Sequence, residues 1–252
     1  MPKQDHFWSA STKDYEKAFI DPYAAGVRGN PVKKVLHRLR GQDAVADLGC
    51  GIGPLLPFLS RRYKAVYAVD FAEGMLKRAK QRVRGAANVN FVRASLTDLC
   101  DVPPVDVAVA VNSLLQPNLD DLEASLREVR RILKPEGWFL GIVPAMDAVH
   151  YMTMLMLDRA RAVGLPPAAA RKNAAHHADH ALFDFAFSEF RYLGTQQHFW
   201  QPAEVGYRFK RAGLVLKRLK KVHLAWNQLT ADKSLHELPA PWDWFFLARP
   251  KE

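Results

Sequence analysis

A short apolar run that ends in a glycine-rich turn is the feature that most limits the folds open to this chain. Val45-Ala46-Asp47-Leu48 has the pattern of a buried strand, and the glycine turn Gly49-Cys50-Gly51-Ile52-Gly53-Pro54 follows it at once. Glycines let backbone amides approach a ligand closely, and proline suits the first turn of a helix because its missing N–H would have no partner there. We therefore predict a strand, a ligand-binding turn, and a helix over residues 55–62 whose N-terminus attracts negative charge.

The strand-then-helix order repeats along the chain. Short β-rich runs alternate with segments of helical periodicity, which predicts a parallel sheet built from strand–helix–strand units. The expected strands are residues 43–48, 65–69, 89–94, 106–111 and 138–143, followed by one within 214–222 and one at 242–249. We predict an α/β fold with a doubly wound, mostly parallel seven-stranded sheet and helices on both faces.

An acidic residue ends the second predicted strand. Asp70 lies 21 residues after Gly49, where a carboxylate can accept hydrogen bonds from both hydroxyls of a ribose. The alternative is a solvated turn residue. A dinucleotide fold would use Gly49 and Gly51 as the first glycines of a Gly-x-Gly-x-x-Gly pattern, but Pro54 occupies the third position, which disfavours NAD as the ligand.

Together these residues resemble a known family. Asp47-Leu48-Gly49-Cys50-Gly51-Ile52-Gly53 is similar to the Asp-x-Gly-Cys-Gly-x-Gly signature of class I S-adenosylmethionine-dependent methyltransferases of the small-molecule type. The resemblance extends over residues 42–144 and more faintly over 200–250. It implies that S-adenosylmethionine is the cofactor, S-adenosylhomocysteine a product, and a small organic molecule the methyl acceptor. Such a transfer is an in-line displacement that mainly requires positioning and exclusion of water.

The resemblance also assigns cofactor contacts. The glycine turn would wrap the methionine portion and the ribose, and Asp70 would hold the ribose hydroxyls. Ser95 stands where many relatives carry an acid that contacts the adenine amino group, and Leu96 would line the adenine pocket. Val111 and Asn112 end the fourth strand near the reactive methyl. The complete set is Asp47, Gly49, Cys50, Gly51, Gly53, Asp70, Phe71, Ser95, Leu96, Val111 and Asn112.

The chain divides into four segments on this interpretation. We expect an N-terminal helical flap at 1–40, a cofactor-binding core at 41–146, a helical insertion at 147–200 that covers the substrate, and completion of the sheet at 201–252. Ligands bind at the carboxyl edge of open α/β sheets, so the insertion is expected to shape the acceptor pocket.

A general base helps only when the acceptor must lose a proton. His180 is the candidate that we select, while a structural or surface role is the alternative. His176 and His180 would share one helix face with Asp184 a turn further on, which resembles a metal-ligand spacing. We predict no metal site, because no third histidine or cysteine is well placed. The full set of candidate bases is His150, Tyr151, His176, His177, His180, Tyr192 and His198.

Apolar side chains are frequent in the insertion and near the N-terminus. Those of the insertion either form core or line a site for an aromatic or lipid-like acceptor. They are Met152, Met154, Met156, Phe183, Phe185, Phe187 and Phe190. The N-terminal set predicts a flap that closes the cofactor site or, alternatively, a hydrophobic staple onto the domain. It consists of Phe7, Trp8, Tyr15, Phe19 and Tyr23.

A formal net charge of +10 raises the question of a polyanionic partner. The densest basic cluster is Lys217, Arg218, Lys220 and Lys221, yet most other basic residues lie on outer helix faces. Asn112-Ser113-Leu114-Leu115 stands where base-amino methyltransferases carry Asn-Pro-Pro-Tyr. A small-molecule acceptor is therefore favoured over nucleic acid. An RNA or protein methyltransferase and a non-catalytic S-adenosylmethionine-binding regulator remain as alternatives.

Two cysteines, Cys50 and Cys100, are too few for a disulfide framework. No apolar run reaches eighteen residues, and the N-terminus lacks the apolar stretch of a signal peptide. We expect a cytoplasmic protein without a membrane span. The sequence does not predict an oligomeric state.

Overall fold

A seven-stranded sheet forms the centre of the computed structural model, which describes residues 20–39, 43–175, 182–192, 195–230 and 233–251. Its strands are β1 (Ala44–Leu48), β2 (Ala65–Asp70), β3 (Val89–Arg93), β4 (Val105–Val111), β5 (Leu133–Pro144), β9 (Leu214–His223) and β10 (Trp242–Pro250). They are ordered β3-β2-β1-β4-β5-β10-β9. The strands from β1 to β5 pair in parallel, whereas β10 is antiparallel to both of its neighbours. The predicted doubly wound, mostly parallel sheet is confirmed.

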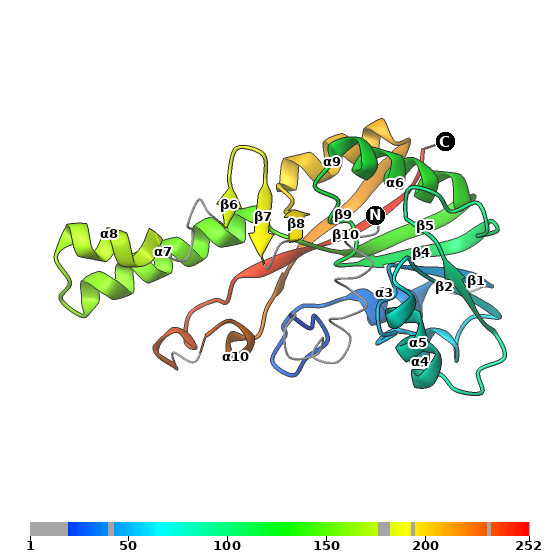
Figure 1. Cartoon of the computed structure of the whole chain (residues 1–252), viewed down its shortest axis with the longest axis horizontal. Helices are drawn as coiled ribbons and strands as arrows, with labels where there is room; N and C mark the ends of the chain where they lie inside the picture. The colour runs from blue at the N-terminus through cyan, green and yellow to red at the C-terminus, as the bar shows by residue number, and fades with distance from the viewer. Residues whose placement is uncertain (1–19, 40–42, 176–181, 193–194, 231–232, 252) are drawn as a thin grey trace.

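Helices cover both faces of this sheet (Figure 1). The helices are α3 (Val32–Arg38), α4 (Leu56–Leu59), α5 (Glu73–Arg82), α6 (Leu119–Ile132), α7 (Met146–Ala162), α8 (Pro167–Ala175), α9 (Pro202–Arg211), α10 (Trp226–Leu229) and the 3₁₀ turn η3 (Lys233–Leu235). Strand β4 explains the two layers, since successive side chains point to opposite faces. Ala108 and Ala110 pack in one core with α6 and α9, while Val107 and Val109 pack in the other with α3, α4 and α5.

The strand order reverses between β1 and β4, which are hydrogen-bonded neighbours although β2 and β3 separate them in sequence. In open α/β sheets the crevice for a ligand lies at such a switch point, outside the carboxyl ends of the strands. Here those ends are Leu48, which leads into the glycine turn, and Val111, which leads into Asn112.

Two element boundaries differ from the predicted ones. The helix after the glycine turn is α4, which spans only Leu56–Leu59. A tight turn follows it, in which the Arg62 N–H donates to the Leu59 carbonyl three residues earlier. A helix this short carries little dipole, and the attraction of negative charge at its N-terminus stays a prediction. Strand β5 begins at Leu133, and the register shifts between Val105 and Val107 as residues 134–137 bulge out.

The insertion is helical only in its first half. Its first half contains helices α7 and α8, which form an arm that extends away from the sheet, and a three-stranded antiparallel sheet follows (Figure 1). Its strands are β6 (Phe183–Asp184), β7 (Glu189–Tyr192) and β8 (Thr195–His198). Phe183 lies in β6, whereas Phe185 and Phe187 lie in the turn that joins β6 to β7. The predicted helix through Asp184 is therefore wrong.

The predicted N-terminal helical flap is wrong for residues 20–31, which form turns and irregular backbone before α3. Gly26 and Gly29 have φ of +93° and +81°, a backbone conformation that helices exclude. Arg28 instead pairs with the end of β9, since its N–H donates to the His223 carbonyl at 2.9 Å and its carbonyl accepts the His223 N–H at 2.9 Å. Residues 1–19, with the rest of the predicted flap, lie outside the described residues.

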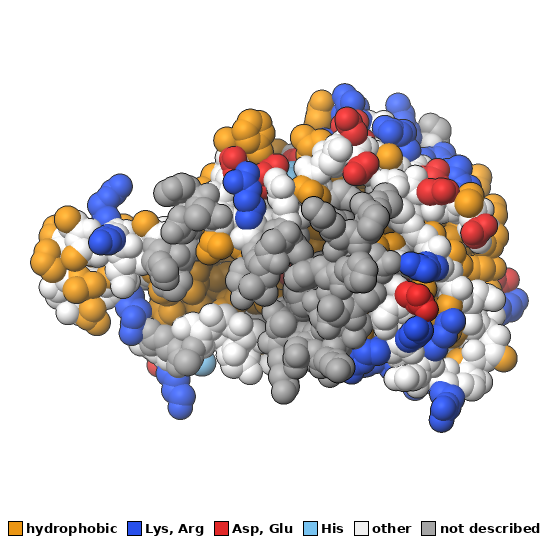
Figure 2. Space-filling view, in the orientation of Figure 1, with side chains coloured by type: hydrophobic (Ala, Val, Ile, Leu, Met, Phe, Trp, Pro, Cys, Tyr) orange, Lys and Arg blue, Asp and Glu red, His pale blue; other side chains and the backbone are white. Residues whose placement is uncertain are grey.

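Charged side chains are scattered over the molecule. Lys and Arg side chains occur around the whole visible outline in Figure 2 and do not gather into one stripe. Among the described residues, no helix combines the length and the apolar character that crossing a bilayer requires.

Candidate functional site

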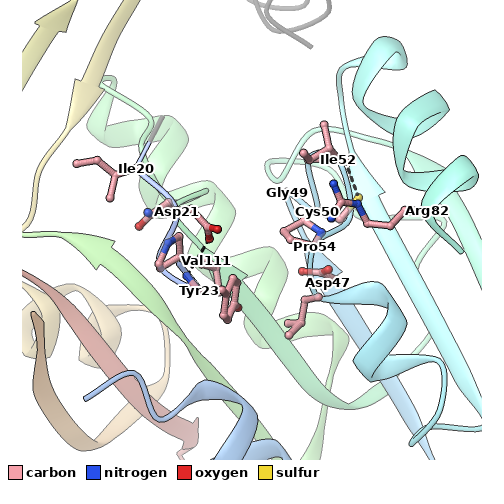
Figure 3. Close-up of a pocket in the computed structure, with 14 residues that line it drawn as sticks. Ile20, Asp21, Tyr23, Asp47, Gly49, Cys50, Ile52, Pro54, Arg82 and Val111 are labelled. Atoms are coloured by element: carbon pink, nitrogen blue, oxygen red, sulfur yellow. Dashed lines mark hydrogen bonds between the residues drawn. The ribbon is translucent and has the colours of Figure 1, made fainter. Parts of the chain in front are cut away.

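A cavity of about 330 Å³ lies at the switch point of the sheet. The glycine turn forms one wall and residues 20–23, which we call the N-terminal strap, form the opposite wall (Figure 3). The lining residues are Ile20, Asp21, Pro22, Tyr23, Asp47, Gly49, Cys50, Gly51, Ile52, Pro54, Leu55, Arg82, Val111 and Asn112. Six of the eleven predicted cofactor contacts thus share one cavity: Asp47, Gly49, Cys50, Gly51, Val111 and Asn112.

The glycine turn needs its glycines for close approach as well as for conformation. Gly49, Gly51 and Gly53 have φ of +69°, +54° and +74°. A Cβ added at Gly49 would lie 2.3 Å from Ser113 Cβ, and one at Gly53 would lie 2.8 Å from a methyl carbon of Leu56. The turn is therefore pressed against the end of β4 on one side and against α4 on the other, which fixes its backbone amides at the cavity.

Asp70 braces this turn from behind. One of its oxygens accepts the Gly51 N–H and the other accepts the Ala72 N–H, each at 2.9 Å. Its carboxylate is buried, and Asp70 is not among the residues that line the cavity. The structure thus gives Asp70 a supporting contact that the sequence did not predict, next to the turn that it was expected to serve.

Asp47 brings a buried carboxylate to the cavity wall. It is only 4% exposed, and its Oδ2 atom has no hydrogen-bond partner among the described residues. Burial and the neighbouring Asp70 carboxylate raise the pKa of Asp47 to about 7. A buried carboxylate without a partner is unfavourable, so the site favours either a proton or a positively charged ligand group.

Asn112 presents a second unsatisfied oxygen. Its φ of +51° is rare for a residue other than glycine, and its N–H donates to the Ile142 carbonyl at 2.8 Å. The side-chain amide donates to buried Asp243, while Asn112 Oδ1 has no partner in the described part of the chain. The Asp243 carboxylate thereby orients the amide so that its oxygen, not its nitrogen, is left for a ligand.

Asp243 was not among the site residues predicted from the sequence. Burial raises the pKa of Asp243 to about 7, against the opposing effect of hydrogen bonds from the Asn112 side chain and the Ala145 backbone. The sequence did contain an indication of its importance, because Asp243 is a single acid between Trp242 and Trp244 in the otherwise aromatic and apolar start of β10. A lone acid in a buried strand needs a partner, and its place at the carboxyl edge beside β5 directs that partner to the site.

The N-terminal strap is pinned in place by polar contacts. Asp21 N–H donates to the Gln228 side-chain carbonyl at 2.7 Å, and the Gln228 amide donates back to the Asp21 carbonyl at 3.2 Å. The Asp21 carboxylate accepts the Tyr23 N–H at 2.8 Å. The Tyr23 hydroxyl is buried and has no partner among the described residues. Tyr23 belongs to the predicted aromatic set, whereas Ile20, Asp21 and Arg82 were missed.

The remaining predicted cofactor residues lie beyond the cavity lining. Gly53 packs on Ala79 of α5, and Phe71 is half-buried against the small cluster around Met75. The Ser95 hydroxyl is 2.8 Å from the Thr97 hydroxyl and accepts the Thr97 N–H at 3.3 Å. Leu96 is buried in the core. The cavity therefore corresponds to only one part of the predicted site.

Of the predicted bases that the structure describes, none lines the cavity. His150 stacks on Phe185 at 4.4 Å between ring centroids, and the Tyr151 hydroxyl donates to the Pro239 carbonyl at 2.7 Å. His198 is buried with Nε2 3.1 Å from a Glu204 oxygen. Tyr192 ends β7. His176, His177 and the selected candidate His180 lie outside the described residues.

Aromatic rings of the insertion form a cluster beside α7. Phe190 lies 4.8 Å from Phe183 and 5.1 Å from Phe199 between ring centroids, and Phe185 stacks on His150. These four phenylalanines are half-buried, so they are neither closed core nor free surface. Within the residues that the structure describes, no group of three His, Cys, Asp or Glu is arranged to hold a metal ion.

Comparisons with known proteins agree with this architecture. Residues 45–137 match a family model described as a methyltransferase domain. The chain is similar to a 2-phytyl-1,4-naphtoquinone methyltransferase of Trichormus variabilis, with 37% identity over 102 residues, 38% of this chain and 44% of that protein. It is also similar to a malonyl-[acyl-carrier protein] O-methyltransferase of Halorhodospira halophila, with 36% identity over 108 residues, 42% of this chain and 36% of that protein.

A solved structure extends the likeness to nearly the whole chain. The 1,6-didemethyltoxoflavin-N1-methyltransferase of Burkholderia thailandensis, solved with 1,6-didemethyltoxoflavin and S-adenosylhomocysteine bound, aligns with a TM-score of 0.63. The alignment covers 99% of this chain and 88% of that one at 16% identity. The chain spans less than half the length of the curated relatives, so the likeness in sequence is confined to part of the protein. The likeness in fold to the Burkholderia structure extends over nearly all of the chain.

Proposed function

Because residues 45–137 form a methyltransferase domain inside a sheet of class I methyltransferase fold, we propose that this chain transfers a methyl group from S-adenosylmethionine to a small, apolar acceptor. One observation carries the proposal. Asp47, Asn112 and Tyr23 line one cavity beside the glycine turn, and each carries a buried polar atom without a partner among the described residues.

These residues fit the proposed cofactor. S-adenosylmethionine carries an amino-acid end with a cationic ammonium and a carboxylate, and a ribose with two hydroxyls, and it supplies a methyl group already activated by the sulfonium. The Asp47 carboxylate and the Asn112 oxygen would hold the ammonium, with the Tyr23 hydroxyl on the opposite wall. Asp70 is proposed to hold the ribose, and Phe71, Ser95 and Leu96 to form the adenine side. The adenine assignment depends on the family resemblance, since the Ser95 hydroxyl already bonds Thr97.

The protein's share of the reaction is positioning and exclusion of water. The strap covers the cavity from one side and is fixed by its paired contacts with Gln228. The insertion follows β5 directly at the carboxyl edge, where the acceptor must approach. Both elements therefore stand where they can hold the acceptor in line and keep water from the reacting atoms.

The aromatic cluster of the insertion favours an aromatic acceptor. Half-buried rings provide a flat, apolar surface, and planar ligands prefer offset stacking on such rings. The name of the Trichormus relative, which acts on a naphthoquinone, points the same way. The Halorhodospira relative acts on malonyl-[acyl-carrier protein], so an acyl group on a carrier protein is the second candidate.

Replacement of Asp70 tests the cofactor site. We expect Asp70→Ala to weaken binding of S-adenosylhomocysteine by about 1.5–3 kcal/mol, as for loss of hydrogen bonds to a charged group. The matched control is Asp101→Ala, an exposed acid in the turn that follows the third strand. Calorimetric titration measures both variants. Unchanged affinity in Asp70→Ala would mean that the ribose lies elsewhere.

His180 remains the proposed general base. If it removes the acceptor proton, His180→Ala lowers the turnover number about 100-fold while leaving the affinity for S-adenosylhomocysteine unchanged. His236→Ala serves as the control, because His236 belongs to a different segment that contacts α10 through Trp226. Turnover that survives His180→Ala on the true acceptor would remove His180 from the mechanism.

The proposed function itself is tested with a defined acceptor. The purified protein is incubated with methyl-labelled S-adenosylmethionine and a hydroxylated naphthoquinone, and the organic extract is analysed by mass spectrometry. The proposal predicts a product that carries the label and one added methyl group. Label found only on added acyl-carrier protein would favour the second candidate, and label found only on added RNA would contradict the small-molecule assignment.

A further inference from the structure

The free end of the α7–α8 arm combines an exposed apolar loop with a collar of positive charge. Residues 162–169, Ala-Val-Gly-Leu-Pro-Pro-Ala-Ala, comprise the last residue of α7, the connecting loop 163–166 and the first three residues of α8, and all of them are exposed. Val163 is 67% exposed and Leu165 is 37% exposed. In Figure 2 this end of the molecule shows hydrophobic side chains at its extremity with Lys and Arg next to them. We call residues 162–169 the arm tip.

The basic collar lies about one helical turn behind the tip. Arg159 and Arg161 occupy the last turn of α7, and Arg171 and Lys172 lie on α8 four to five residues after its start. All four are exposed, and Asp158 is the single acid between residues 158 and 175. At a rise of about 1.5 Å per residue, the α8 cations stand about 6–8 Å from the start of their helix.

The arm itself is firmly built, so the exposure of its tip is a property of a packed element. Leu155 and Met156 of α7 and Ala174 of α8 share a small core with Trp226, Leu235 and Ala240. The Arg159 guanidinium also donates to the Ser234 hydroxyl at 3.0 Å. This small core covers the apolar faces of both helices near the body, and among the described residues no surface covers the apolar side chains of the tip.

We propose that the arm tip docks this protein onto an anionic membrane surface. Apolar side chains inserted at the boundary of headgroups and acyl chains, with Lys and Arg at headgroup level, are the common pattern of reversible membrane attachment. Val163 and Leu165 are the large exposed apolar side chains of the tip, whereas a stable protein interface takes about 20–30 residues and about 800 Å² on each partner. The charge of the collar selects an anionic surface over a neutral one.

The attachment also suits the acceptor. An apolar aromatic acceptor partitions into lipid, and docking by the arm would hold the insertion close to that supply. This part of the argument rests on the proposed function. The attachment does not, because the arm and its charges are present whether or not a methyl group is transferred.

Sedimentation with lipid vesicles tests the attachment in the absence of any cofactor. Vesicles of phosphatidylcholine and phosphatidylglycerol in equal amounts are compared with vesicles of phosphatidylcholine alone. We expect the protein to sediment with the mixed vesicles and not with the neutral ones, and added salt to release it. Failure to bind the mixed vesicles at low salt would overturn the proposal.

Two pairs of variants identify the surface. The double variant with Val163→Ser and Leu165→Ser is expected to weaken vesicle binding at least about tenfold. Its control is Leu119→Ser on α6, where the leucine is about as exposed as Leu165, and this variant is expected to bind vesicles unchanged. Arg171→Glu with Lys172→Glu is likewise expected to weaken binding at least about tenfold. Lys217→Glu with Lys220→Glu makes the same change of net charge on exposed residues of β9 and is expected to have little effect.

Each outcome supports or contradicts docking of the arm tip onto a membrane. Binding that survives both arm variants, or that is lost equally in the β9 variant, would contradict docking through the tip. If the tip variant abolishes self-association in analytical ultracentrifugation but not vesicle binding, the tip is a contact between copies and the proposal is wrong. Calorimetry with S-adenosylhomocysteine accompanies every variant, so a failure of cofactor binding, which concerns the proposed function, is recorded separately.

Discussion

Gly49→Ala is expected to weaken the binding of S-adenosylhomocysteine strongly. The new Cβ would lie 2.3 Å from Ser113 Cβ, and the backbone at this position has a φ of +69°. Left-handed conformation costs about 1–2 kcal/mol for a residue with a Cβ, and overpacking adds about 1–3 kcal/mol. The turn must shift to relieve both, which displaces the amides at the cavity. We expect Kd to rise by about 100-fold or more, measured by calorimetry.

Gly85 is a matched control that separates the cost of the left-handed backbone conformation from the cost of the steric clash with Ser113. Gly85 has a φ of +86°, but a Cβ there would have no atom within 4 Å. Gly85→Ala should therefore lose about 1 kcal/mol of stability and leave Kd unchanged. Ser113→Gly added to Gly49→Ala removes the atom of closest approach and should restore part of the affinity. If Gly49→Ala binds S-adenosylhomocysteine as the wild type does, the glycine turn is not the cofactor site.

Asp47→Asn is expected to stabilise the protein and to weaken its cofactor site. The Asp47 carboxyl titrates near 3.8 when unperturbed, whereas burial and Asp70 raise its pKa to about 7 in the folded protein. The unfolded chain thus releases this proton first as pH rises, so the group destabilises the folded state progressively between about pH 4 and pH 7, and fully above pH 7. The shift corresponds to at most about 4 kcal/mol. We expect Asp47→Asn to add about 2–4 kcal/mol to the free energy of unfolding at pH 8, and almost nothing at pH 4.

The same substitution tests the role of the negative charge in binding. In the wild type, affinity for S-adenosylhomocysteine should fall about tenfold for each pH unit below 7, because the carboxyl must lose its proton to hold a cationic group. In Asp47→Asn, affinity should be weaker and independent of pH over that range. Asp98→Asn, an exposed acid in the turn after β3, controls for net charge. Identical pH profiles for Asp47→Asn and wild type would show that Asp47 does not hold the cofactor.

Residues close together in sequence were predictable. The strand, the glycine turn and Asp47 form one continuous segment whose spacing is set by the local backbone. Asp47 and every residue of the turn at 49–54 except Gly53 line the cavity. Asp70 was also located correctly at the end of its strand. Its contact with Gly51 N–H was not predicted, because the sequence does not reveal which side of the turn the carboxylate braces.

Residues brought in from a distance were missed. Asp243 lies 131 positions after Asn112, and Gln228 pins the strap 207 positions from Asp21. Such pairs depend on the neighbouring order of β5 and β10 and on the path of the N-terminal segment, which no local pattern encodes. The prediction for the insertion was wrong for another reason. Its alanine-rich α8 indicates a helix, and the residues from Phe183 to His198 were assigned to the same helical segment. Their strands are two to four residues long and are held by pairing with one another, which a pattern this short does not reveal.

The most direct test of methyl transfer uses labelled S-adenosylmethionine and a cell extract. The purified protein and the methyl-labelled cofactor are incubated with the extract after its separation into small-molecule, RNA and protein fractions, with Gly49→Ala as the inactive control. We predict label in an apolar compound of the small-molecule fraction with the wild type and none with the variant. Label that enters only RNA or protein, or label transfer that Gly49→Ala supports equally well, would contradict the proposed function.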